Sequence, residues 1–152
     1  MRGSRSAVLR GARVSGLLLA QGPAQRQVHA GRGVAALSAS VRLADLPWLS
    51  QVDFDHALWS ADLNFVRGED SFVRAQWAGA PFVWQIYPQD DGAHHAKIEA
   101  FLDAWLAGAP QDLAGSVRAL WRWWNGLGEP PSSWPPAQAW AAQAGRWRNG
   151  LL

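Results

Sequence analysis

The feature that most constrains the fold is a pair of short apolar runs set between helical stretches. One run is Leu63-Asn64-Phe65-Val66, and the other, 81–87, is rich in aromatic and β-branched residues and ends at Pro88. Short apolar runs bounded by turn residues are typical of buried strands. Residues with helical periodicity flank both runs, at 52–60, 70–79, 93–107, 113–125 and 137–148. The order α-β-α-β-α-α-α predicts a parallel α/β unit, and two clear strands predict part of a sheet rather than a whole one.

Charge divides the chain near Leu43. Residues 1–42 hold seven Arg and no acidic residue, whereas residues 43–152 carry a net charge of −5. The first part has no sustained helical or strand period, and it is Arg-rich and acid-free, as targeting peptides are. GC-rich DNA read in the wrong frame would give the same composition. We expect 1–42 to be an unrelated leader, disordered or frameshift-derived, and 43–152 to be a partial nucleotide-sugar-binding domain.

Composition excludes several classes of protein. The chain is 49% hydrophobic and 17% charged, too apolar for a disordered protein. Its acidic body argues against nucleic-acid binding, and the apolar run Leu17-Leu18-Leu19-Ala20 is too short for a membrane span. The absence of Cys excludes disulfides, thiolate zinc sites and Cys nucleophiles, and it fits a reducing compartment, so we expect a cytoplasmic protein.

Eleven Trp lie between Trp48 and Trp147. Four fall on apolar faces and are expected in the core: Trp59, Trp77, Trp84 and Trp105. Five others spread around the last two helices: Trp121, Trp123, Trp124, Trp140 and Trp147. Some of these five are expected to face solvent, a sugar or a partner.

The densest polar cluster is Arg67-Gly68-Glu69-Asp70-Ser71, between a strand and a helix start. The carboxyl end of a strand facing free helix N–H groups is where α/β proteins bind phosphates. Gly68 permits a tight turn, Arg67 can neutralise an anion and Ser71 can donate a hydrogen bond. The two acids count against a plain phosphate site. Asp70 as the helix N-cap is one explanation, which leaves Glu69 without a structural task.

A second polar group follows the second predicted strand. A metal site formed by Asp91, His94 and His95 is conceivable, but the spacing matches no established ligand pattern. Asp91 as the N-cap of the next helix is the simpler interpretation, and we expect no metal. Tyr87 is placed either for a phosphate or sugar contact or as a core aromatic.

The residues of this region resemble a known family. The run NFVRGEDSFVRAQWAG, followed by PFVWQIYPQ, is similar to the bacterial protein-arginine rhamnosyltransferases that mature elongation factor P. The resemblance covers Leu46 to Leu106, and residues 1–42 show none of it. It implies an inverting GT-B glycosyltransferase, of which this chain is part of the Rossmann-like C-terminal domain, ending in helices. The donor would be dTDP-β-L-rhamnose, with no cofactor, and the acceptor an arginine of elongation factor P.

The resemblance also implies roles for individual residues. Gln51 would recognise the thymine base and Phe54 would stack on it. The diphosphate and sugar would be held by Arg67, Asp70, Ser71 and Tyr87. Glu69 matches the essential glutamate of the family's motif. A guanidinium is a poor nucleophile, so a carboxylate that orients it suits the chemistry.

The departures from the family's pattern matter equally. The family's N-terminal domain, with the aspartate proposed as general base, has no counterpart in the sequence. We therefore expect a truncated or frameshifted enzyme that is inactive alone, with unpaired sheet edges that favour aggregation. The alternative is a non-catalytic module that uses its Trp-rich helices to bind a protein or sugar.

Overall fold

The computed structural model describes residues 5–11, 14–20, 42–45, 48–89 and 92–151, with side chains from Trp48 onward. A five-stranded sheet has the order β3-β1-β2-β4-β5. Its strands are β1 (Arg5–Gly11), β2 (Val14–Ala20), β3 (Arg42–Asp45), β4 (Asn64–Arg67) and β5 (Phe82–Gln85). The helices among the described residues are α2 (Gln51–Ser60), α3 (Glu69–Ala78), α4 (Ala93–Trp105), α5 (Gln111–Trp124) and α6 (Ala137–Leu151).

The part of the fold that follows α2 confirms the predicted alternation of helices and strands. β4 and β5 are parallel, with Asn64 opposite Phe82 and Arg67 opposite Gln85. The helix α3 between them ends at Gly79, whose φ of 68° is the left-handed geometry that glycine adopts readily. The parallel pairing brings the carboxyl ends of both strands to one edge of the sheet.

The described residues 5–11 and 14–20 form strands, which differs from the expectation of a disordered leader there. β1 and β2 pair as antiparallel strands, and β2 then pairs in parallel with β4, with Leu17 opposite Asn64. β2 therefore has neighbours on both sides. A central strand of this kind is a short apolar run in which polar and apolar residues do not alternate. A search for strand periodicity therefore misses it.

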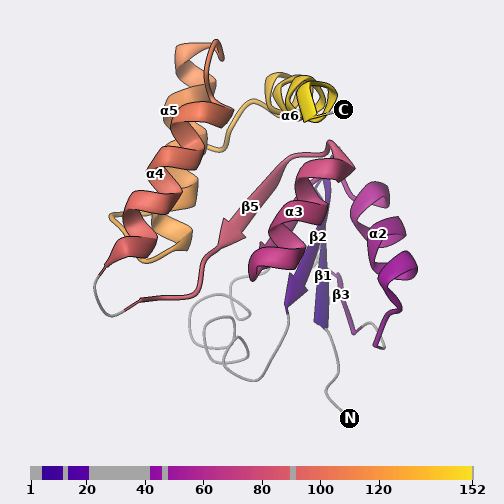
Figure 1. Cartoon of the computed structure of the whole chain (residues 1–152). Coiled ribbons are helices and arrows are strands. Elements are labelled where there is room, and N and C mark those ends of the chain that lie inside the picture. The colour runs from indigo at the N-terminus through magenta and orange to yellow at the C-terminus, as the bar shows by residue number, and fades with distance from the viewer. Residues whose placement is uncertain (1–4, 12–13, 21–41, 46–47, 90–91, 152) are drawn as a thin grey trace.

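Helices cover the sheet on several sides. Figure 1 shows α2 and α3 side by side, α4 and α5 along the β5 side, and α6 near the end of α3. The α3–α6 contact is fixed by a hydrogen bond of 2.9 Å from Trp147 Nε1 to Gln76 Oε1. Phe72 of α3 stacks on Trp84 of β5 with ring centroids 4.0 Å apart, which seats α3 on the sheet.

The outer edge of β5 is covered, contrary to our expectation of unpaired sheet edges there. Trp121 Nε1 donates to the Phe82 carbonyl at 3.1 Å. One turn later in the chain, Asn125 accepts from the Ile86 N–H at 3.0 Å and donates to the Trp84 carbonyl at 2.8 Å. Polar groups of α5 and its C-cap thus replace the missing strand partner and block edge-to-edge pairing.

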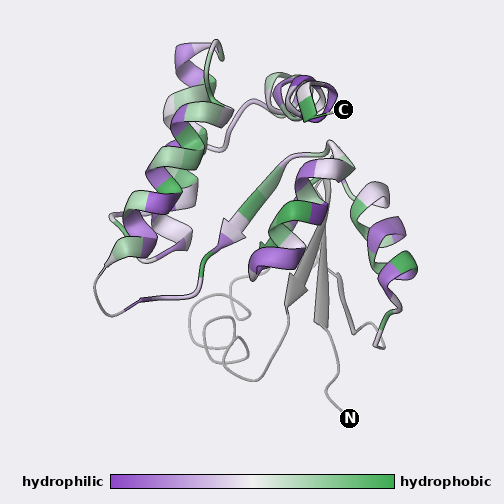
Figure 2. Cartoon of the chain, viewed as in Figure 1, coloured by the Kyte–Doolittle hydropathy of each residue, from purple (hydrophilic) through white to green (hydrophobic). Residues whose placement is uncertain are grey.

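The core confirms two of the four Trp residues expected there and contradicts two. Trp84 and Trp105 are buried, whereas Trp59 is 60% and Trp77 56% exposed. Each exposed Trp points away from the buried stripe of its helix, since α2 buries Phe54 and Leu58, and α3 buries Ser71 and Ala75. Figure 2 shows hydrophobic and hydrophilic residues mixed on the outer faces of both helices.

The C-terminal Trp residues are more buried than their spread around the helices indicates. Trp121 and Trp140 are buried, and Trp123, Trp124 and Trp147 are half-buried. Among the residues that the structure describes, no helix is long and apolar enough to cross a membrane.

Candidate functional site

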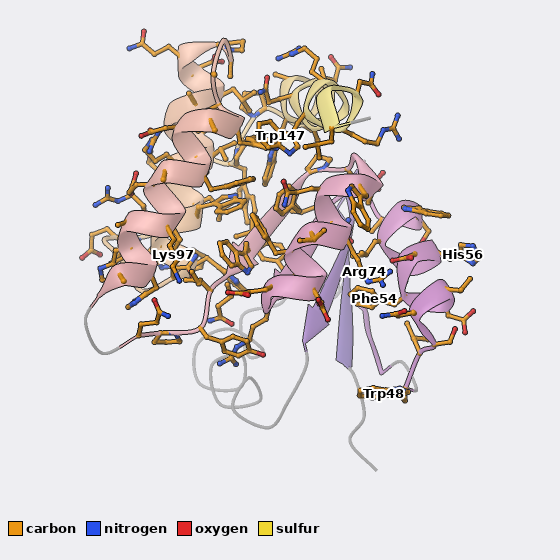
Figure 3. All side chains as sticks on the ribbon, viewed as in Figure 1. Trp48, Phe54, His56, Arg74, Lys97 and Trp147 are labelled. Carbon is orange, nitrogen blue, oxygen red and sulfur yellow. The ribbon has the colours of Figure 1, made fainter. Side chains whose placement is uncertain are left out.

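A pocket of about 230 Å³ lies where the N-termini of α2 and α3 meet. It is lined by Trp48, Leu49, Ser50, Gln51, Phe54, Asp70, Ser71 and Arg74. Figure 3 shows Phe54 and Arg74 close together between the two helices, with Trp48 on the segment that leads into α2. One wall is therefore apolar and amide-bearing, and the other is polar and charged.

The wall from α2 is held by a side-chain cap. The Ser50 hydroxyl oxygen accepts from the Asp53 N–H at 3.2 Å, and the same hydroxyl donates to Asp53 Oδ2 at 2.7 Å. A serine N-cap satisfies a backbone donor that would otherwise lack a partner at the start of a helix. This cap fixes the first turn of α2, which presents Gln51 and Phe54 to the pocket.

The wall from α3 has no such cap. Its N-cap residue is Gly68, with φ 84° and ψ 167°, and no side chain bonds to the end of the helix. Asp70 lies inside the first turn, so its interpretation as the N-cap is wrong. The Phe72 N–H donates to the Gly68 carbonyl at 3.2 Å. The N–H groups of the three preceding residues therefore have no intrahelical acceptor and can bind an anion.

The backbone at Gly68 is set by aromatic residues from β5 and the residues after it. Trp84 Nε1 donates to the Gly68 carbonyl at 3.2 Å. A Cβ at position 68 would lie 3.3 Å from Tyr87 Cε2 and from the Tyr87 hydroxyl oxygen. This backbone geometry is essentially restricted to glycine, because a side chain would be strained. The sequence prediction of a tight turn at Gly68 is confirmed.

Arg67 and Tyr87 form a second group beside this turn. The Arg67 guanidinium carbon lies 4.8 Å from the centroid of the Tyr87 ring, a cation–π contact. Tyr87 is 53% exposed, so it is not the core aromatic of the alternative interpretation. Arg67 Nε is buried and has no hydrogen-bond partner among the described residues. A buried donor without a partner is costly, and an anion would satisfy it.

Glu69 occupies the first position of α3 and is exposed. Its carboxylate has no ion pair or hydrogen bond within the described part of the chain. The dipole of α3 favours a negative charge at this position. The Glu69 carboxylate is therefore placed to interact with a cation that enters the site.

The structure brings together four of the residues predicted from sequence, since Gln51, Phe54, Asp70 and Ser71 line one pocket. The other four lining residues were not predicted as site residues: Trp48, Leu49, Ser50 and Arg74. Arg74 had a detectable signal: it follows Asp70 by four positions, which places both on the same face of a helix. Trp48 precedes the helix, and no periodicity places it.

The second polar cluster is only partly described, because Asp91 lies outside the described residues. The next helix, α4, has Gly92 as its N-cap. His94 Nδ1 accepts from the Gln89 N–H at 3.0 Å, and the His94 and His95 rings lie 4.0 Å apart. The His94 side chain thus connects the first turn of α4 to Gln89.

An uncapped helix N-terminus at the carboxyl end of a parallel strand is the arrangement of α/β proteins that bind phosphate-containing ligands. Comparison with known proteins gives the particular family. Residues 6–152 match the family described as Elongation-Factor P (EF-P) rhamnosyltransferase EarP. The chain belongs to this family, as the resemblance predicts.

Individual relatives agree with this family assignment. A protein-arginine rhamnosyltransferase of Pseudomonas aeruginosa PAO1 is 46% identical over 114 residues, which are 72% of this chain and 30% of the relative. That of Pseudomonas putida KT2440 is 46% identical over 131 residues, 85% of this chain and 31% of the relative. The chain thus spans about a third of these relatives.

A solved structure is also similar, one that concerns the structural basis for EarP-mediated arginine glycosylation of translation elongation factor EF-P. It matches with a TM-score of 0.61 and 33% identity over 94% of this chain and 48% of that one. The family match begins at residue 6, inside the segment expected to be unrelated. The expectation that residues 1–42 do not resemble the family is therefore wrong from residue 6 onward.

Proposed function

We propose that this chain carries donor-binding elements of a protein-arginine rhamnosyltransferase. The donor is dTDP-β-L-rhamnose, the acceptor is an arginine of elongation factor P, and the unit is part of the C-terminal domain of a GT-B enzyme. The observation that carries the proposal is the pocket between α2 and α3, because it joins Gln51 and Phe54 to Asp70 and Ser71.

The α2 side of the pocket suits a nucleobase. Phe54 is 9% exposed and lines the pocket, so its ring is anchored in the core next to the space that a base would occupy. Gln51 has an amide that can both donate to and accept from a base. Trp48 adds a second aromatic ring at the same wall. Apolar walls with few polar groups are typical of sites that bind small molecules.

The α3 side suits a diphosphate. The uncapped N–H groups after Gly68 and the cation of Arg67 offer donors to phosphate oxygens, and Tyr87 holds Arg67 in place. These donors are fixed before the ligand arrives. They would therefore stabilise the negative charge that develops on the leaving diphosphate without reorganisation.

Transfer with inversion forms a bond from a guanidinium nitrogen to the anomeric carbon of rhamnose. The bond from that carbon to the diphosphate oxygen breaks, and its electron pair leaves with dTDP. The proton lost by the nitrogen goes to a general base, which the resemblance assigns to the family's N-terminal domain. Glu69, exposed at the donor end of the site, orients the guanidinium and localises its charge. This chain alone is expected to be a poor catalyst.

Donor binding is tested by titrating the purified chain with thymidine diphosphate and following Trp fluorescence. Trp48 lines the pocket, so we expect quenching, and Asp70→Ala should abolish it. A wild-type chain that gives no response would contradict the donor site. Asp112→Ala is a matched control, because Asp112 is an exposed first-turn acid of another helix, α5.

Transfer is tested by mass spectrometry of elongation factor P after incubation with dTDP-rhamnose and the chain. We expect no mass change, whereas a full-length relative should add one deoxyhexose. A gain by the chain alone would show that it is catalytically sufficient.

A second function, binding of a protein or sugar by exposed Trp, is favoured by Trp59, Trp77 and Trp134, each more than half exposed. Binding that survives Asp70→Ala but is lost in a Trp59→Ala, Trp77→Ala double variant would support it.

A further inference from the structure

One ion pair joins the two helices that form the pocket. Arg74 Nη1 of α3 lies 2.8 Å from Asp55 Oδ1 and 2.7 Å from Asp55 Oδ2 of α2. The side chains are only 21% and 27% exposed, so solvent screens the pair less than a fully exposed one. In the described part of the chain it is the only ion pair between α2 and α3.

The pair lies next to the pocket, on the two helices that form its walls. Asp55 follows Phe54 on α2, and Arg74 follows Asp70 and Ser71 by one turn on α3. Arg74 lines the pocket, whereas Asp55 does not. Asp55 can therefore affect a bound molecule only through Arg74 or through the spacing of the helices.

The two walls have separate anchors apart from this pair. The start of α2 is fixed by the Ser50 cap, and its last turn accepts a 3.0 Å hydrogen bond from Asn64 Nδ2 to the Leu58 carbonyl. The start of α3 is fixed by the Gly68 turn and its bond to Trp84. None of these bonds links the start of α2 directly to the start of α3.

We propose that Asp55 and Arg74 are positioning residues that set the spacing between the two walls of the pocket. The inference rests on the proposed function: one wall takes the nucleoside and the other the diphosphate. A single ligand that spans both walls gains from their fixed separation, because each half is bound with the other already in place.

A direct role of Arg74 makes the opposite prediction. If Asp55 only withheld the Arg74 cation from a phosphate, its removal would free that cation and strengthen diphosphate binding. The sign of the effect of Asp55→Asn therefore separates the two roles.

The experiment measures the affinities of thymidine diphosphate, thymidine and pyrophosphate by calorimetry. For Asp55→Asn we expect thymidine diphosphate to bind about 10- to 100-fold more weakly, as for a misplaced binding group. Thymidine and pyrophosphate, which each occupy one wall, should bind as they do to the wild-type chain. Arg74→Lys, which keeps a cation, should retain more affinity than Arg74→Gln.

The matched control is Glu99→Gln. Glu99 of α4 pairs with Arg118 and Arg122 of α5, and its 31% side-chain exposure is similar to that of Asp55. This variant should leave all three affinities unchanged. Urea unfolding of each variant checks that the chain is folded under the conditions of the titration.

Three other outcomes would overturn the inference. Unchanged or tighter binding of thymidine diphosphate by Asp55→Asn would exclude the positioning role while leaving the donor site intact. Equal weakening of all three ligands would indicate general loss of the pocket. A wild-type chain that binds none of them would overturn the proposed function together with the inference.

Discussion

The N-termini of α2 and α3 lie at the same pocket but are built differently. α2 begins at Ser50, whose hydroxyl bonds to Asp53 and closes the first turn. α3 begins at Gly68, which has no side chain, and its first backbone donors are open. A cap stabilises a helix by satisfying its free donors, whereas an open end keeps those donors for a ligand. The difference separates a structural helix start from one suited to binding an anion.

The surroundings of each start agree with this difference. Ser50 and Asp53 are exposed and bond to each other. Gly68 is buried under Tyr87, and Arg67 stacks on the same ring. The start of α3 is thus held by aromatic packing from residues after β5 instead of by its own side chains.

The largest expected effect comes from Gly68→Ala. A Cβ at φ 84° and 3.3 Å from the Tyr87 ring strains the backbone and displaces Tyr87. We expect the free energy of unfolding to fall by about 1–3 kcal/mol, the usual cost of such strain. Thymidine diphosphate binding should weaken as well. Urea denaturation and calorimetry measure the two effects.

Gly128→Ala is the control for Gly68→Ala. Gly128 has a φ of 85°, but a Cβ there meets no atom within 4 Å. Its substitution should lower stability through strain and leave ligand binding unchanged. Equal losses of binding in both variants would contradict a specific role for the Gly68–Tyr87 contact.

A smaller effect is expected from Ser50→Ala, which opens the start of α2. Loss of a serine N-cap costs about 1 kcal/mol in the free energy of unfolding. Pyrophosphate binding should not change, because the diphosphate donors belong to α3. Chemical denaturation measures the free energy of unfolding, and calorimetry measures the affinity for pyrophosphate. Weaker pyrophosphate binding in this variant would mean that the two helix starts are not independent.

The smallest effect on stability is expected from Glu69→Gln. Glu69 is exposed, and its carboxylate has no partner in the described part of the chain. The free energy of unfolding should therefore change by no more than about 0.5 kcal/mol. Thymidine diphosphate binding should persist. The equivalent substitution in a full-length relative should abolish rhamnose transfer, measured by mass spectrometry, and retained transfer would exclude the proposed role.

Local sequence patterns predicted the helices and strands after residue 50, because nearby residues mark where each one ends and which face is buried. Gly79 ends α3 in left-handed geometry, and Phe54 and Leu58 mark the buried face of α2. The same logic failed for Trp59 and Trp77. That a residue is apolar does not show whether it faces the core. In α2 and α3 only two residues each are buried, so the sequence pattern alone does not show where the buried face ends.

The candidate site was predictable in part. The RGEDS run lies at a strand end and a helix start, a position that topology alone assigns to anions. Arg74 and Trp48 were not predicted, because their part in the site depends on how α3 packs against the segment before α2.

The sequence by itself determined the alternation of strands and helices after residue 50, the tight turn at Gly68 and the family. These depend on neighbouring residues, whose spacing, backbone freedom and identity can be read along the chain. Only the tertiary structure decided that β2 joins the sheet beside β4, that Asn125 covers the edge of β5, and that Asp55 reaches Arg74. Each of these contacts joins residues far apart in the chain. Local sequence patterns do not predict such contacts, because they depend on how the helices and strands pack against one another.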